Sequence, residues 1–283
     1  MRKRLRIESA GSSRLGVFVR VALFILAAGC TRPSSGWGFG AMTYQNPVDI
    51  VLGTMGSASV LITEVAGNPR RPVDWQIEAT QRRLFGIDDL TTDGVAVGLR
   101  FGQWGAMVSA THLATPVGNQ AGLLIEPFHV RSRVFALAGG VSFSRLTVVG
   151  TPSVHRSTVS ATMAVRIIDE LTVGYHIGDV RIAGETHPGA DVTVYAVVRG
   201  GSLVALYGRT EVTRQGAVNV GIAAHTGFGK HIRGALGYDG ATGSFTGAVA
   251  CALGRVGVRA GAELHPVLGM SKSVSVVLGG GGL

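Results

Sequence analysis

Six arginines occupy equivalent positions on different predicted strands of this chain: Arg100, Arg166, Arg199, Arg233, Arg255 and Arg259. Each falls on the polar phase of an alternating apolar–polar stretch, so the six guanidinium groups are expected on the polar faces of their strands. If these faces enclose a lumen, the lumen is electropositive and favours anionic solutes or headgroups. The competing interpretation is a structural network, with Arg259 bonded to Glu263 and Arg233 to Asp239 or to neighbouring strands. Both interpretations remain open at the level of sequence.

Residues that often perform catalysis or bind metals are present, but not in the required patterns. None of the eight histidines lies in an HExxH or paired-cysteine context, and His112, His176 and His225 lie on separate predicted strands. We therefore predict no metal and no cofactor. Ser142 lacks the closing glycine of a GxSxG nucleophile motif, and no glycine-rich run opens a helix after a strand. The chain is predicted not to be an enzyme, and a lipid-cleaving barrel hydrolase is the weakest alternative.

The elements that position these residues show a period of two. In residues 218–225, Val218, Val220, Ile222 and Ala224 alternate with a second, more polar set, and residues 244–253 repeat the pattern. Such alternation is typical of β-strands with one apolar face. The pattern predicts fourteen strands: Trp75–Phe85, Gly94–Phe101, Trp104–Leu113, Leu123–Val130, Val134–Val149, Ser157–Ile168, Leu171–Gly178, Val192–Arg199, Ser202–Val212, Ala217–His225, His231–Tyr238, Ser244–Leu253, Arg255–Glu263 and Ser271–Leu278.

Hydropathy favours a membrane over water as the surroundings of these strands. Mean hydropathy is +0.34, yet no window after residue 30 has the ~18 uninterrupted apolar residues of a membrane helix. A soluble β-sandwich shares the alternation, but its polar face should be rich in Lys and Glu, and the whole chain has three lysines. We therefore predict an all-β, antiparallel transmembrane β-barrel of about 14 strands with an N-terminal plug-like segment.

The N-terminal region predicts export and divides the chain into three parts. Residues 1–29 have the basic and apolar regions of a signal peptide, residues 30–73 form a tether and plug-like segment, and residues 74–283 form the barrel. Residues 26–30, LAAGC, resemble a bacterial lipobox in which Cys30 would be acylated, and ordinary cleavage near Ala28 is the alternative. Removal of the signal lowers the net charge from +9 to +4, which gives nucleic-acid binding little support.

Several stretches resemble PorV/PorQ-like outer-membrane proteins, which belong with the FadL-type fourteen-stranded barrels. They are the closing LHPVLGMS of residues 264–271, LFG at 84–86, FGQWGA at 101–106, MGSA at 55–58 and the Asn68–Pro69 pair. The resemblance implies the bacterial outer membrane as the location. It also implies either transport of hydrophobic compounds or a partnership with a protein-secretion system. The leading expectation is a barrel that passes or holds small or amphiphilic ligands through its Arg-lined lumen. The alternative is a non-transporting scaffold for a secretion or surface-attachment partner.

Overall fold

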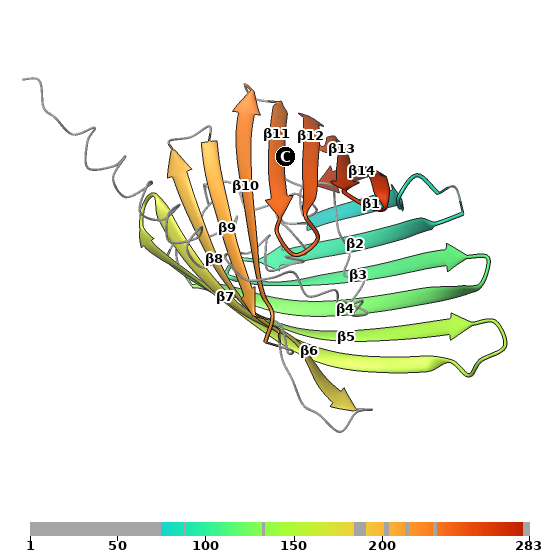
Figure 1. Cartoon of the computed structure of the whole chain (residues 1–283). Coiled ribbons are helices and arrows are strands. Elements are labelled where there is room, and N and C mark those ends of the chain that lie inside the picture. The colour runs from blue at the N-terminus through green and yellow to red at the C-terminus, as the bar shows by residue number, and fades with distance from the viewer. Residues whose placement is uncertain are drawn as a thin grey trace, which may run out of the picture.

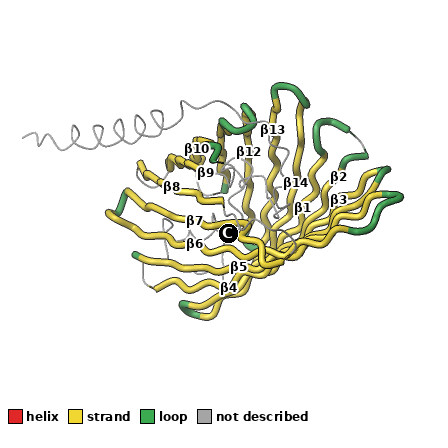
Figure 2. Tube along the Cα trace, turned by 60° about the horizontal axis from the view of Figure 1, so that its bottom comes forward, coloured by secondary structure: helices red, strands yellow, loops and turns green. Residues whose placement is uncertain are grey.

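The computed structural model describes residues 75–87, 89–131, 134–183, 191–200, 204–212, 216–228 and 231–279, and these residues form strands joined by turns (Figures 1 and 2). The first seven strands are β1 (Trp75–Arg83), β2 (Thr91–Phe101), β3 (Trp104–Thr115), β4 (Gly118–Arg131), β5 (Phe135–Val148), β6 (Val154–Ile168) and β7 (Leu171–Ala183). The others are β8 (Asp191–Gly200), β9 (Val204–Val212), β10 (Val218–Phe228), β11 (Ile232–Asp239), β12 (Ser244–Leu253), β13 (Val256–His265) and β14 (Gly269–Gly279). Across these ranges, no helix has the length and apolar character needed to span a membrane.

The strands form a closed antiparallel barrel in which each strand pairs with its neighbours in the sequence (Figure 1). The circle is completed by β1 and β14, whose pairing runs from Gln76 opposite Gly279 to Arg83 opposite Lys272. Closure gives both edge strands a partner, which is required wherever the backbone cannot bond to water. The predicted all-β, antiparallel architecture is confirmed, and each predicted segment overlaps one of the observed strands. The signal peptide, Cys30 and the plug-like segment lie outside the described residues.

Side chains along each strand alternate between the interior and the outer surface of the barrel. On β14, Ser271, Ser273, Ser275 and Val277 are buried inside, whereas the residues between them are exposed. The outer surface carries large apolar side chains on every side, including Val97 on β2, Ile222 on β10, Leu236 on β11, Val249 on β12 and Val276 on β14. A continuous exposed apolar surface of this kind is unfavourable in water and matches the hydrocarbon core of a bilayer.

The two ends of the barrel differ in their connections. The connections that follow β2, β4, β6, β8, β10 and β12 have two or three residues, and this end also holds Trp75 and Gly279, where β1 begins and β14 ends. We call it the short-turn end. The opposite, long-loop end has connections of up to seven residues, at 84–90 and 184–190, although 116–117 and 266–268 have only two and three residues. Outer-membrane barrels place short turns in the periplasm and longer loops outside the cell, which orients this barrel.

Aromatic side chains on the outer surface gather toward both ends. At the short-turn end, Phe101 and Trp104 are 75% and 65% exposed, and the Trp104 ring lies 4.2 Å from that of His129. At the long-loop end, the rings of Tyr238 and Phe245 lie 4.9 Å apart. Aromatic residues at both membrane interfaces are a feature of transmembrane barrels.

Several strand ends differ from the sequence prediction by a few residues, and two of them have clear local reasons. β1 ends at Arg83, before the predicted Phe85, because Phe85 has a positive φ of 53° and begins a turn. Its backbone N–H donates to Ser271 Oγ at 3.1 Å. β4 begins at Gly118, before the predicted Leu123, because residues near the barrel end are polar on both faces and no longer alternate.

The alternation predicts opposite results for arginine at two adjacent positions in the middle of β2. The Val97→Arg substitution places a charge on the outer surface, at a cost of about 2–4 kcal/mol near the bilayer midplane. Gly98 faces the interior, and a Cβ there would meet no atom within 4 Å, so Gly98→Arg should assemble normally. The measurement is the fraction of membrane-extracted protein that migrates as a folded form before boiling. Equal assembly of the two variants would contradict the outward assignment of Val97.

Candidate functional site in the barrel interior

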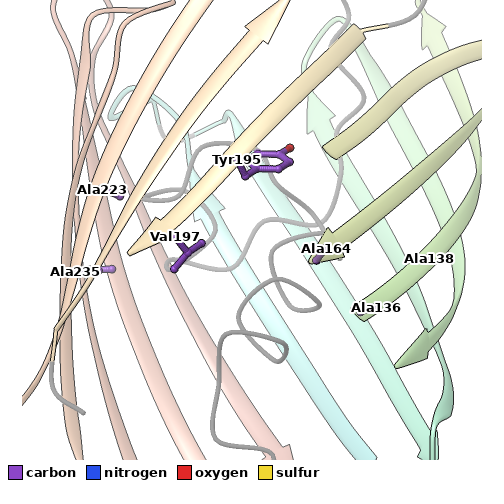
Figure 3. Close-up of a cluster of buried hydrophobic side chains, with 8 residues drawn as sticks. Ala136, Ala138, Ala164, Tyr195, Val197, Ala223 and Ala235 are labelled. Atoms are coloured by element: carbon purple, nitrogen blue, oxygen red, sulfur yellow. The ribbon is translucent and has the colours of Figure 1, made fainter. Parts of the chain in front are cut away.

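A cluster of small apolar side chains lines part of the barrel interior (Figure 3). Its buried members are Ala136, Ala138, Ala164, Tyr195, Val197, Ala223, Ala235 and Ala248, with Phe128 and Val130 packed against them. They come from β4, β5, β6, β8, β10, β11 and β12, so the cluster extends across neighbouring strands. We call it the apolar cluster. The lumens of water-filled porins are polar, so an apolar interior surface suits a ligand with an apolar part.

Three of the predicted arginines lie beside this cluster on the same strands. Arg166 follows Ala164 by two residues on β6, and Arg199 follows Val197 by two residues on β8. On β11, Arg233 precedes Ala235 by two residues. Residues two apart share one face of a strand and are separated by roughly 6.6 Å. The three guanidinium-bearing side chains therefore border the apolar cluster on its short-turn side.

Two further predicted arginines lie at the same end of the barrel. Arg100 is the penultimate residue of β2, and its Nε donates to the Gly102 carbonyl at 3.0 Å. Arg255 was predicted to open a strand, but it lies in the exposed turn before β13. There its carbonyl accepts a hydrogen bond from the Gly279 backbone N–H. Both residues thus add positive charge near the short-turn end rather than in the middle of the lumen.

The sixth arginine, Arg259, lies deeper and forms an ion pair. Its Nη1 lies 2.9 Å from Glu78 Oε2, and the Glu78 side chain is only 2% exposed. The prediction that Arg259 bonds to Glu263 is wrong, because Glu263 pairs with Arg82 instead. Each of these pairs joins β1 to β13 across the intervening β14. We call them the seam ion pairs.

The inner face of β14 makes these crossings possible. Ser271, Ser273 and Ser275 are all buried, and their short side chains leave room for longer ones from either neighbouring strand. Arg259 lies opposite Ser275 in the β13–β14 register, and Arg82 lies opposite Ser273 in the β1–β14 register. The structural-network interpretation therefore applies to Arg259, with a different partner from the predicted one.

The structure also places the other residues that the sequence analysis singled out, namely the Arg233–Asp239 pair and the three strand histidines. Arg233 and Asp239 lie at opposite ends of β11, and Asp239 accepts a hydrogen bond from the Ala241 backbone N–H at 2.9 Å. His112, His176 and His225 lie on β3, β7 and β10. His176 Nδ1 bonds with Thr162 Oγ1 at 2.8 Å. In the described part of the chain, no group of three His, Cys, Asp or Glu side chains could hold a metal ion.

Sequence reasoning missed the apolar cluster and Glu78, the buried acid of the seam ion pairs. A weak signal for the cluster was available, because alanines recur on the phase that was interpreted as polar, at Ala164, Ala223, Ala235 and Ala248. Glu78 is also on the polar phase of its strand. Its partner is 181 residues away in the chain, so no local spacing indicates it.

Comparisons with solved structures show the class of fold. The chain is similar to the CymD monoaromatic hydrocarbon channel, with TM-score 0.60, 7% identity, and coverage of 86% of this chain and 99% of that one. It is also similar to the TodX deltaS2S3 mutant monoaromatic hydrocarbon channel, with TM-score 0.54, 6% identity, and coverage of 85% and 99%. The Acinetobacter baumannii outer membrane protein Omp33 gives TM-score 0.52, 8% identity, and coverage of 74% and 98%.

The fold is therefore that of outer-membrane β-barrel channels. No protein-family model matches the chain, and no curated protein matches it.

The seam ion pairs predict unequal effects of two isosteric substitutions. Glu78→Gln leaves Arg259 facing a neutral amide in a buried setting, so the free energy of unfolding should fall by about 3 kcal/mol, the lower end of the range for breaking a buried ion pair. Glu263→Gln acts on a pair whose side chains are 18% and 17% exposed, so about 1 kcal/mol is expected. Urea unfolding in detergent, followed by tryptophan fluorescence, gives both values. A loss from Glu263→Gln equal to or larger than that from Glu78→Gln would contradict this ranking.

Proposed function

We propose that this protein is an outer-membrane barrel that holds or passes amphiphilic anions through its interior. The observation that carries the proposal is the position of Arg166, Arg199 and Arg233 beside the apolar cluster. A single-chain amphiphile has the same division, with an anionic head for the guanidinium groups and an apolar chain for the Ala and Val side chains. Guanidinium groups bind carboxylates and phosphates with good geometry.

An outer-membrane location is supported by the closed barrel, the apolar outer surface and the shared fold of outer-membrane channels. Two of those channels are described as monoaromatic hydrocarbon channels, and a hydrocarbon-compatible interior is in keeping with the apolar cluster here. Membership of the PorV/PorQ-like group, removal of residues 1–29 and acylation of Cys30 are further parts of the proposal. They rest on the sequence alone. The role as a scaffold for a secretion or surface-attachment partner stays a prediction from the sequence.

The orientation of the barrel in the membrane shows which side of it the three arginines lie toward. The three arginines lie toward the short-turn end, which faces the periplasm in the orientation derived above. A ligand that enters from outside would move along the barrel toward the positive charge. The long-range attraction of a low-dielectric lumen for an anion would assist that movement.

The proposal predicts a loss of anion binding when the three arginines are neutralised together. Purified barrel in detergent is titrated with a fluorescent C12 carboxylate and with the uncharged C12 alcohol that carries the same fluorophore. The triple variant Arg166→Gln, Arg199→Gln and Arg233→Gln should bind the carboxylate at least about tenfold more weakly, because hydrogen bonds to charged groups are lost. Binding of the alcohol should change less than about twofold, because the apolar cluster is intact.

Arg145→Gln is the matched control. Arg145 lies near the long-loop end of β5, and its Nη2 bonds to Ser153 Oγ at 3.2 Å, so its neutralisation should leave carboxylate binding unchanged. Equal carboxylate binding by the wild-type protein and the triple variant would contradict the assignment of the three arginines. A wild-type barrel that binds neither probe would contradict the amphiphile function itself.

A further inference from the structure

A histidine and an arginine face the barrel interior as close neighbours on two adjacent strands. His225 on β10 shares the inward phase of the buried Ala223, and Arg233 on β11 shares the inward phase of the buried Ala235. His225 is the register partner of Ala235 (labelled in Figure 3). His225 and Arg233 are therefore diagonal neighbours, with Cβ atoms within about 8 Å of each other. The positive charge of Arg233 reaches the His225 ring. We call these two residues the His–Arg pair.

The inward positions next to the His–Arg pair carry no acidic side chain. The register partners of Arg233 are Gly227 on β10 and Ala250 on β12. In the described part of the chain, neither the His225 ring nor the Arg233 guanidinium group has a hydrogen bond or an acidic partner. The Arg233 side chain is exposed on the lumen side of its strand. Its charge is therefore available to an anion that enters the lumen.

His225 also joins the apolar cluster to a second arginine. Ala223 and Ala235, its inward neighbours on β10 and β11, both belong to the apolar cluster. In the other direction, Ala205 on β9 is the register partner of both His225 and Arg199. Arg199 is thus two interstrand spacings from His225, about 10 Å. A headgroup beside His225 therefore has a guanidinium-bearing strand on either side, and the alkyl chain attached to it can lie along the apolar cluster.

We propose that the His–Arg pair binds the phosphate monoester group of a single-chain amphiphile. The proposal rests on the amphiphile function proposed above and names the headgroup. A guanidinium group bonds two oxygens of an anion with parallel N–H donors, and a carboxylate has only two oxygens. A phosphate monoester carries close to two negative charges at pH 7 and has three acceptor oxygens, so one oxygen is left to accept a hydrogen bond from a ring N–H of His225. His225 thereby gives the site a preference for phosphate over carboxylate.

The test compares headgroups on the purified barrel in detergent. The probes are a fluorescent C12 phosphate monoester, the C12 carboxylate with the same fluorophore, and inorganic phosphate. His225→Ala should bind the C12 phosphate at least about tenfold more weakly than the wild-type protein, because a hydrogen bond to a charged group is lost. Its binding of the C12 carboxylate should change less than about twofold, because the arginines are intact. His225→Gln should bind the C12 phosphate within about threefold of the wild-type protein, because its amide N–H is also a donor.

His112→Ala is the matched control, because it removes a histidine that is exposed on the outer surface of β3. It should bind all three probes as the wild-type protein does. Equal binding of the C12 phosphate by the wild-type protein and His225→Ala would overturn the site, and so would an equal loss in His112→Ala. A loss in His225→Gln as large as that in His225→Ala would overturn the hydrogen bond. Binding of inorganic phosphate with the affinity of the C12 phosphate would show no contribution from the alkyl chain, and would overturn the assignment to an amphiphile.

Failure of this proposal is separable from failure of the proposed function. His225→Ala places one more alanine among the alanines of β10 and β11, so it should keep its folded mobility before boiling. If the wild-type protein binds the C12 carboxylate and the C12 phosphate equally, and His225→Ala binds both as the wild-type protein does, only the headgroup assignment is wrong. If the wild-type protein binds neither amphiphile, the proposed function itself is wrong.

Discussion

The pairing of β1 with β14 is the constraint on which the rest of the structure depends. Without it, both strands would present unpaired N–H and C=O groups, each costly in a hydrocarbon environment. The two strands lie nearly at opposite ends of the described chain, so their pairing requires all the intervening hairpins to be in register. The seam ion pairs cross at this place, joining β1 to β13 over the serines of β14. Closure and the polar inner face of β14 therefore support each other.

Once the sheet is closed, the alternation of side chains along each strand decides whether a residue faces the interior or the exterior of the barrel. Odd and even positions of a strand face opposite sides, so one set meets the exterior and the other the interior. The exterior set is apolar over the middle of the strands and aromatic toward both ends. The interior set is divided between a serine- and ion-pair-rich region near β14 and the apolar cluster, with Arg166, Arg199 and Arg233 beside it. This division is the basis of the interior site proposed above for an amphiphilic anion.

Most of the strand positions could be predicted from the sequence, because a two-residue period is a local property. The inward phase of Arg259 was predictable for the same reason. The interior partners were not: Arg259 bonds to Glu78, which becomes its neighbour only through closure. Arg255 was placed on a strand because it continues the alternation, but Gly254 has a positive φ of 68° and begins the turn that holds it. The apolar cluster was not predicted because alanine is compatible with either the inner or the outer face of a strand.

Disulfide trapping of the β1–β14 pair tests the central claim most directly. Ala79 and Val276 are register partners with exposed side chains, and opposed residues lie within the Cα separation that a disulfide spans. In a Cys251→Ser background, the Ala79→Cys, Val276→Cys variant should form an intramolecular disulfide, detected by peptide mass spectrometry. The pair Ala79→Cys, Val274→Cys is two residues out of register and should form little. Failure of the in-register pair to cross-link in membrane-extracted monomer, or equal cross-linking of both pairs, would contradict a barrel closed in this register.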